Sequence, residues 1–230
     1  APKGAYAYSK DVNTEFREMV RCFHQNGIDV MMQFYFPPEI RHTEIVAVLD
    51  YWVTEYHIDG FHVMGVDMPI TMLAQEPLLS DTKLLTEHFY PDAGFRQMGE
   101  SKTVALMNDG YLYEMRKFLK GDDNMMNRFL HHMRNSSSDI GIINYIARWD
   151  GMRLRDLVSY DRKHNEKNGE ANQDGTDYNC SWNCGVEGKS RKKAIVQLRQ
   201  RQMMNALAFV MLSQGTPLLY SGDEFGFSQE

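Results

Sequence analysis

Apolar positions along the 230-residue chain follow two alternating spacings. Some segments repeat apolar residues three and four positions apart, as on one face of a helix, and short, nearly continuous apolar runs typical of buried strands stand between them. Helices are predicted over residues 13–26, from Thr43 onward, and over 111–119, 125–134, 154–160 and 191–212. Strands are predicted at residues 28–36, 57–63, 82–89, 103–109, 141–150 and 217–220.

This alternation predicts an α/β fold with a parallel sheet. Strands that are apolar almost throughout need cover on both faces, and the intervening helices supply it. A doubly wound sheet and a (β/α) barrel both satisfy the pattern. No strand runs into a G-x-G-x-x-G turn, so the barrel is favoured, with its site at the C-terminal ends of the strands. We expect one domain over residues 1–230, with a long Asn- and Gly-rich loop at 161–189 that is functional or disordered.

Composition narrows the class of protein. A hydrophobic content of 43% suits a sizeable core, and a net charge of -6 argues against a nucleic-acid partner. No apolar run is long enough to cross a bilayer, so no membrane association is expected. The odd, sparse cysteines Cys22, Cys180 and Cys184 favour a reducing, cytoplasmic location, and no metal or cofactor is expected because the CxxxC pair has no second ligand pair.

Polar residues stand where several predicted strands end. Carboxylates that converge there are the arrangement that glycoside hydrolysis needs, although a single acid at a strand end is more often simply solvated. The strand-end residues are Gln33, Pro37, Pro38, His62, Met64, Glu87, His88, Asn108, Asp109, Trp149, Asp150, Asp223 and Glu224.

Four segments make the chain resemble one family. "YWVTEYHIDGF", "MNDGYLYEMRKFLKGDD", "SYDRKHNEKNGEANQDGTDYNCSWNCGVEG" and "GTPLLYSGDEFG" are similar to segments of the isoamylase, pullulanase and glycogen debranching branch of the α-amylase superfamily, glycoside hydrolase family 13. The resemblance implies a (β/α)8 TIM barrel, with the strands of this chain matching family strands 3 to 8. By this resemblance, family strands 1 and 2 and the C-terminal β-domain are expected to lie outside this chain, and missing segments or self-association are expected to complete the barrel.

The resemblance also implies a catalytic set. The family retains anomeric configuration with an Asp nucleophile, a Glu acid/base and a second, stabilising Asp. The Glu falls on Glu87 in "KLLTEHF". The stabilising Asp falls on Asp150, but the His that precedes it in the family is replaced by Trp149.

The nucleophile position departs from the family pattern. The family reads Asp-Gly-Phe-Arg-Phe-Asp, whereas this chain reads "DGFHVM" from Asp59, so the nucleophile falls on Met64 and its Arg partner on His62. The earliest family motif becomes "QFYFPP" from Gln33, without its polar groups. A thioether cannot form the glycosyl-enzyme ester, and Asp67 on the following loop is displaced by three residues. Impaired catalysis is therefore expected.

Four residues are candidates for substrate binding: His62, Trp149, Trp182 and Asn183. His62 is more often a hydrogen-bonded core residue in such a position, and Trp182 fits a core role and a sugar-stacking role equally well.

Three functions remain open from the sequence. The leading hypothesis is a debranching-type homologue that is catalytically impaired and retained for binding α-glucan or maltooligosaccharide, or for a structural role. The first alternative is active or altered hydrolysis of α-1,6/α-1,4-glucans by Glu87 and Asp150. The second alternative is a structural fragment with no ligand.

Overall fold

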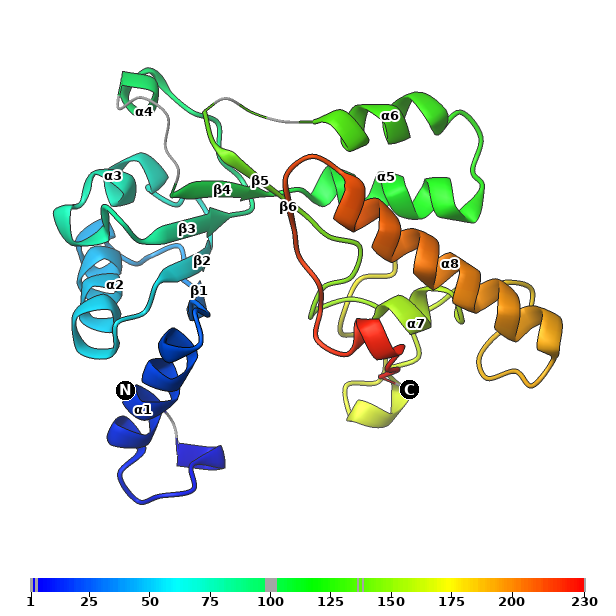
Figure 1. Cartoon of the computed structure of the whole chain (residues 1–230), viewed down its shortest axis with the longest axis horizontal. Helices are drawn as coiled ribbons and strands as arrows, with labels where there is room; N and C mark the ends of the chain where they lie inside the picture. The colour runs from blue at the N-terminus through cyan, green and yellow to red at the C-terminus, as the bar shows by residue number, and fades with distance from the viewer. Residues whose placement is uncertain (1, 3, 98–102, 136, 138, 230) are drawn as a thin grey trace. The chain divides into compact units, whose positions relative to one another are not determined.

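The computed structural model describes residues 2, 4–97, 103–135, 137 and 139–229. The chain forms two compact units, Ala1–Met107 with Ser137–Gly141 (unit 1) and Asn108–Ser136 with Ile142–Glu230 (unit 2) (Figure 1). Six strands follow the order β1-β2-β3-β4-β5-β6, and the described pairs are parallel. This confirms the α/β class with a parallel sheet and is consistent with a partial TIM barrel. The single barrel domain stays a prediction.

Unit 1 carries the first four strands. They are β1 (Met31–Tyr35), β2 (Gly60–Met64), β3 (Lys83–Thr86) and β4 (Val104–Met107). The helices are α1 (Val12–Gln25), α2 (His42–Tyr56), α3 (Ile70–Gln75) and α4 (Ala93–Gln97), with 3-10 turns η1 (Gly4–Tyr6) and η2 (Pro77–Leu79). The short helices α3 and α4 carry too few turns for the apolar spacing to predict them.

Local signals set the ends of the first helices. The Asp11 carboxylate accepts a hydrogen bond of 3.2 Å from the backbone N–H of Thr14 and so caps α1. Gly27 follows α1 with a φ of +69°, the left-handed conformation in which many helices end. Helix α2 begins at His42, one residue before the predicted Thr43, and ends through His57 in the left-handed region.

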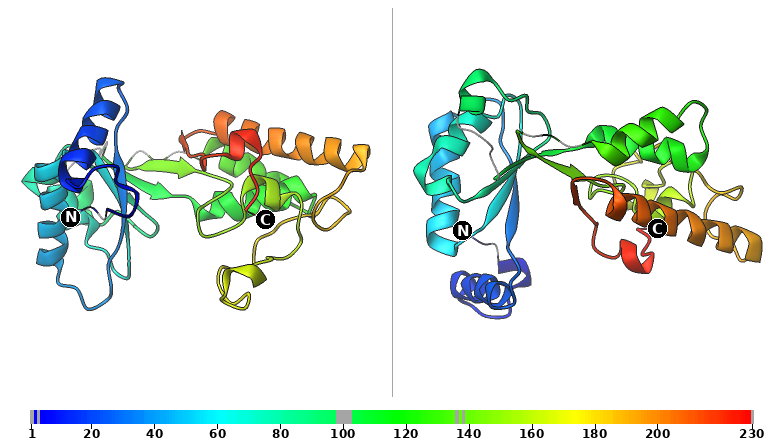
Figure 2. Two further views of the ribbon diagram at one scale, coloured as in Figure 1. Left: turned by 90° about the horizontal axis from the view of Figure 1, so that it is seen from below. Right: turned by 45° about the horizontal axis from the view of Figure 1, so that its top comes forward.

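The core of unit 1 lies between its sheet and its helices. Helices α2 and α3 lie along one face of β1–β4 (Figures 1 and 2). Phe61 and Val63 of β2 point to that face and are buried with Leu49 and Leu73. His62 and Met64 alternate with them and therefore point to the opposite face, where they are only half-buried.

Unit 2 is mainly helical. It contains α5 (Asp109–Lys120), α6 (Met126–Arg134), α7 (Leu154–Leu157) and α8 (Lys193–Leu212). It also contains β6 (Thr216–Pro217) and the 3-10 turns η3 (Glu166–Asn168) and η4 (Asp223–Phe225). Strand β5 (Gly141–Asn144) belongs to unit 2 except for Gly141, its first residue, which is assigned to unit 1. Tyr111 and Met115 of α5 are fully buried with Leu154, Ala206 and Val210, so the core of unit 2 joins α5, α7 and α8.

Two predicted strands are much shorter in the structure. The strand predicted over 141–150 ends at Asn144, and the apolar residues Tyr145, Ile146 and Ala147 that follow are buried without belonging to a strand. The strand predicted over 217–220 is wrong beyond Pro217, and Leu218 and Leu219 are exposed. An apolar run indicates burial, but the backbone pairing depends on the neighbouring strand.

No helix in the part of the chain that the structure describes is long and apolar enough to cross a membrane.

A buried histidine lies between α5 and α6. His132 Nε2 is 2.7 Å from Glu114 Oε2, and Glu114 also pairs with Arg128. The other ring nitrogen of His132, Nδ1, is buried and has no hydrogen-bond partner among the described residues. Burial lowers the pKa of His132 despite the nearby Glu114 carboxylate, because protonation would place an unpaired N–H in the core.

This histidine should make unit 2 sensitive to acid. A histidine with a lowered pKa in the folded state contributes stability above its unfolded pKa of about 6.5 and loses it as the pH falls below that value. We expect the free energy of unfolding to decrease from pH 6.5 downward, by at most about 1.4 kcal/mol per pH unit from this group. Urea unfolding between pH 7.5 and 5.5 measures the slope. His132→Gln should flatten the slope and the exposed His131→Gln should not; equal slopes in both variants would contradict the assignment.

Candidate functional site

The C-terminal ends of β1, β2 and β3 place several candidate residues on one face of unit 1. Gln33 pairs in register with His62, Tyr35 with Met64, and His62 with Leu85. Residues that are level on neighbouring parallel strands point to the same side, so these side chains share the face opposite α2 and α3. Gln33 and Tyr35 are exposed on it, as are Pro37 and Pro38 after the strand.

Met64 closes β2, where the family resemblance implies the nucleophile. Its backbone carbonyl accepts a hydrogen bond of 2.8 Å from Phe36 N–H, which joins the ends of β1 and β2. Gly65 follows with a φ of +149°, and a Cβ there would lie 2.6 Å from the carbonyl oxygen of Phe36. The turn after β2 therefore requires glycine, while the residue before it presents a thioether without an ionisable group.

Glu87 lies beside His62 in unit 1. The distance from His62 Nε2 to Glu87 Oε1 is 3.9 Å, and the two side chains are 13% and 21% exposed. Carboxyl and imidazole groups are the side chains that general acid–base catalysis uses most often. The structure thus brings together two of the candidate residues, and their roles remain predictions.

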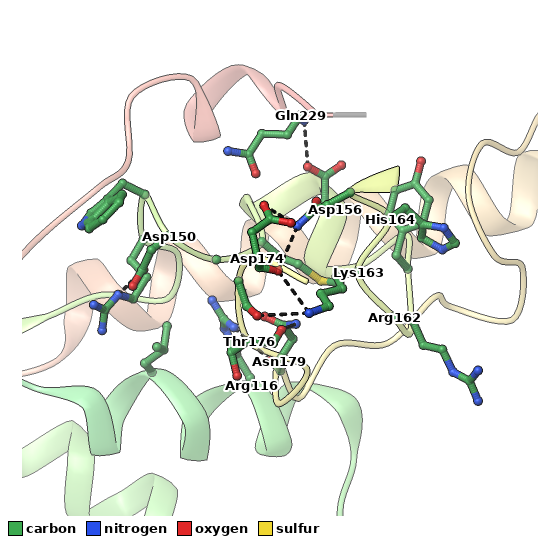
Figure 3. Close-up of a pocket in the computed structure, with 18 of the residues that line it drawn as sticks. Arg116, Asp150, Asp156, Arg162, Lys163, His164, Asp174, Thr176, Asn179 and Gln229 are labelled. Carbon is green, nitrogen blue, oxygen red and sulfur yellow. Dashed lines mark hydrogen bonds and ion pairs between the residues drawn. The ribbon is translucent and has the colours of Figure 1, made fainter. Parts of the chain in front are cut away.

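Unit 2 contains a cavity of about 850 Å³ between α5, the turn after β5 and the long loop (Figure 3). The lining combines aromatic rings with charged and amide side chains, which is the mixture that saccharide sites use. Its members include Tyr113, Arg116, Arg148, Trp149, Asp150, Tyr160, Lys163, Asn165, Asp174, Thr176 and Asn179.

Asp150 is held by the arginine two residues before it. Arg148 Nε lies 2.5 Å from Asp150 Oδ1, and Arg148 Nη1 lies 3.1 Å from Asp109 Oδ1. Tyr145 O–H donates to the same Asp109 oxygen. This network fixes the position of the Asp150 carboxylate at the cavity wall, although the side chain is still 39% exposed.

The loop predicted at 161–189 is ordered by its own polar groups. Lys163 Nζ donates to the carbonyls of Asp174 and Gly175 at 3.1 Å each and pairs with Asp177 at 3.2 Å. Asn165 Nδ2 donates to Asp174 Oδ2 at 3.2 Å. These contacts fold the loop back on itself at the cavity.

The remaining substrate-binding candidates take different positions. Trp149 is 51% exposed and lines the cavity, so its ring is available to a ligand. Trp182 is half-buried and donates its backbone N–H to Leu157. The Asn183 side chain is occupied within the loop, since its amide donates to Asp161 and Glu187 and its oxygen accepts from Gly185 N–H.

Reasoning from the sequence missed several members of the cavity. Arg116, Lys163 and Asp174 lie there, and none of them follows a strand or matches a family catalytic motif. The Arg-Trp-Asp order did offer one signal for Arg148, because a basic residue close to a carboxylate often pairs with it. In the described ranges, 4–97 and 103–229 with their gaps, no group of three or more His, Cys, Asp or Glu could hold a metal ion.

No family model matches the chain. A comparison with individual proteins finds relatives whose names refer to glycogen debranching, to a glycogen operon or to isoamylase. The chain is 40% identical over 208 residues to "Glycogen debranching enzyme" of Serratia proteamaculans and 37% identical over 207 residues to "Glycogen operon protein GlgX homolog" of Mycobacterium tuberculosis. It is 34% identical over 274 aligned residues to "Isoamylase 1, chloroplastic" of Oryza sativa. The alignments cover 81%, 80% and 100% of this chain.

The chain is a homologue of these debranching proteins. They form the isoamylase and glycogen debranching branch of glycoside hydrolase family 13. The present chain spans about a third of the length of these relatives: 31%, 29% and 32% in the same order.

Proposed function

We propose that this debranching homologue binds α-glucan or maltooligosaccharide and is impaired in the two-step retaining hydrolysis of its family. The observation that carries the proposal is Met64 at the end of β2, where the family pattern has the nucleophile. A thioether has no oxygen to attack the anomeric carbon, so no glycosyl-enzyme ester can form there. A cytoplasmic location is part of the proposal.

Binding is supported by features of each unit that do not depend on Met64. Glu87 keeps a basic neighbour in His62, and Asp150 is held by Arg148. Trp149 presents an exposed ring beside Asp150 in the cavity of unit 2. A flat aromatic surface next to fixed acceptors suits a pyranose ring, whose apolar face stacks while its hydroxyl groups donate hydrogen bonds.

The experiment is a calorimetric titration of the protein with maltotriose and maltohexaose, combined with an assay for hydrolysis on the same preparation. Binding without turnover supports the proposal. Turnover at ordinary glycosidase rates would contradict the impairment, and the absence of any binding would favour a structural module without a ligand.

Replacing Trp149 should weaken this binding selectively. We expect Trp149→Ala to raise the Kd for maltohexaose about tenfold, because loss of one stacked ring costs on the order of 1.5 kcal/mol. Tyr8→Ala removes a fully exposed ring of unit 1, outside the cavity, and serves as the control. Equal Kd values for Trp149→Ala and the unsubstituted protein would show that the ring does not contact the glucan.

Altered hydrolysis by Glu87 and Asp150 is the second candidate. It is favoured by the basic partner that each carboxyl retains, His62 and Arg148. An inverting reaction needs one carboxylic acid and one carboxylate about 6.5–9.5 Å apart with a water molecule between them and the sugar. Glu87→Gln would abolish such an activity, whereas an unchanged rate in Glu87→Gln would eliminate this candidate.

A further inference from the structure

The wall of the unit 2 cavity is more positively charged than the protein as a whole. Five Arg or Lys residues line it, namely Arg116, Arg148, Arg162, Lys163 and Lys167, against three Asp residues. The whole chain, by contrast, has a formal net charge of -6. A local excess of positive charge on an acidic protein favours ligands that carry negative charge.

The three aspartates of the wall are already engaged. Asp150 pairs with Arg148, Asp156 accepts a hydrogen bond of 2.9 Å from Gln229 N–H, and Asp174 accepts one from Asn165. Lys163 is likewise held by two carbonyls and a carboxylate of its own loop. Arg162 points away from the labelled group (Figure 3). These side chains therefore do not determine which ligand the cavity prefers.

Arg116 is a buried charge in this wall, and no counter-ion is paired with it among the described residues, whereas Arg162 and Lys167 are exposed to solvent. Arg116 extends from α5 and is only 3% exposed. Its Nε donates to Ile146 O at 2.8 Å and its Nη1 to Asn179 O at 2.9 Å, both neutral acceptors. Its Nη2 is buried and has no hydrogen-bond partner, and no carboxylate pairs with it, among the residues that the structure describes. Burial lowers the pKa of Arg116 to about 10, so the group remains charged at neutral pH.

Burial of a guanidinium that has an unpaired N–H and no counter-ion costs folding free energy. An oxyanion in the adjoining cavity would lower this cost, because it would accept a hydrogen bond from the N–H and neutralise the charge. Thr176 and Asn179 line the same cavity beside Arg116 (Figure 3), so a ligand bound there lies close to the guanidinium. Tyr113 and Trp149 line the same cavity and supply rings for a sugar.

We infer that the unit 2 cavity recognises a saccharide that carries an oxyanion, a phosphate ester or a carboxylate, with the oxyanion held by Arg116. The inference rests on the proposed glucan binding and adds the charged substituent. Phosphate and carboxylate offer the same kind of acceptor to an arginine, so the experiment has to separate them.

The first test is a calorimetric titration of the unsubstituted protein with four ligands: maltotriose, maltotriose 6-phosphate, maltotriose oxidised to a 6-carboxylate, and inorganic phosphate. We expect at least one charged trisaccharide to bind about tenfold or more tightly than maltotriose, and the tighter of the two identifies the oxyanion. Raising the salt concentration should reduce that preference.

The other outcomes are distinct. Equal affinity for all three trisaccharides would overturn the inference and leave the proposed glucan binding intact. Failure of every trisaccharide to bind would overturn both. Inorganic phosphate that binds as tightly as the phosphate ester would overturn the role of the saccharide.

The second test replaces the arginine. Arg116→Lys keeps the charge but removes the forked donor, so the ratio of affinities for charged and neutral trisaccharide should fall about tenfold. Arg201→Lys makes the same change at an exposed position of α8 and should preserve the ratio. An unchanged ratio in a folded Arg116→Lys protein would overturn the inference. Should that variant not fold, nitrogen-15 NMR of the arginine side chains in the unsubstituted protein decides, because the Arg116 resonance must move with the charged ligand and not with maltotriose.

Discussion

Pullulan, glycogen and maltooligosaccharides are expected to be hydrolysed by this protein about a million-fold more slowly than by a debranching enzyme that keeps its Asp nucleophile. Removing the nucleophile from a concerted catalytic set raises the barrier by about 8 kcal/mol, because the remaining groups act only together with it. Met64 cannot substitute, since its sulfur has no proton to lose and forms no stable glycosyl intermediate. Release of reducing ends over days at high protein concentration measures the residual rate.

The control for this prediction is a debranching enzyme whose nucleophilic Asp has been changed to Met. Its rate should fall into the same range as that of the present protein, which separates the effect of the missing carboxylate from any other difference between the two chains. A rate near that of the unsubstituted enzyme would contradict the impairment. Glu87→Gln would then show whether the activity depends on the Glu87 carboxyl.

The longer helices could be predicted from the sequence because their signals are local. Apolar spacing located α1, α5, α6 and α8 to within two residues at each end. The residues that flank α5 show why, since Asn108 caps its first turn through Tyr111 N–H and Gly121 adopts the left-handed conformation after its last turn. Each of these signals acts within one or two turns of the helix, so no knowledge of the tertiary fold was needed.

The ends of the last two strands could not be predicted in the same way. Burial of Tyr145, Ile146 and Ala147 satisfies the apolar pattern whether or not their backbone pairs with another strand. Asn144 marks the end of β5 through tertiary contacts, because its side chain accepts from Asn108 Nδ2 and donates to Gln214 O. These partners are distant in the sequence, so the pattern of β5 alone does not reveal them.

The candidate site residues also differ in whether their signal is local in the sequence or depends on the fold. Glu87 and Asp150 are candidates because each lies in a motif that resembles a family motif, and their catalytic roles stay predictions. Arg116 was not a candidate, since its place in a helix suggests an ordinary exposed cation and its burial depends on residues 30 and 63 positions away. A candidate residue in a motif can be named from the sequence, whereas the burial of a charged side chain can be recognised only in the fold.

Arg199 provides the strongest single test of how the loop at 161–189 is held. It is buried on α8 and is 7% exposed. Its Nη1 donates to Gly188 O at 2.7 Å, and its Nη2 donates to the carbonyls of Asn183, Ser159 and Val186. One side chain thus satisfies four backbone acceptors, three in the loop and one at Ser159, two residues after the end of α7.

We expect Arg199→Ala to lower the free energy of unfolding by about 3–5 kcal/mol, because several buried carbonyls lose a charged donor and a cavity remains. Arg199→Lys should recover only part of this loss, since an ammonium cannot reproduce the planar fork. Urea unfolding followed by tryptophan fluorescence measures both, and Trp182 within the loop reports on it directly. Arg201→Ala, which is exposed two residues further along α8, should change the stability by less than about 0.5 kcal/mol. A loss below about 1 kcal/mol in Arg199→Ala would mean that the carbonyls find other donors and that the loop does not depend on this arginine.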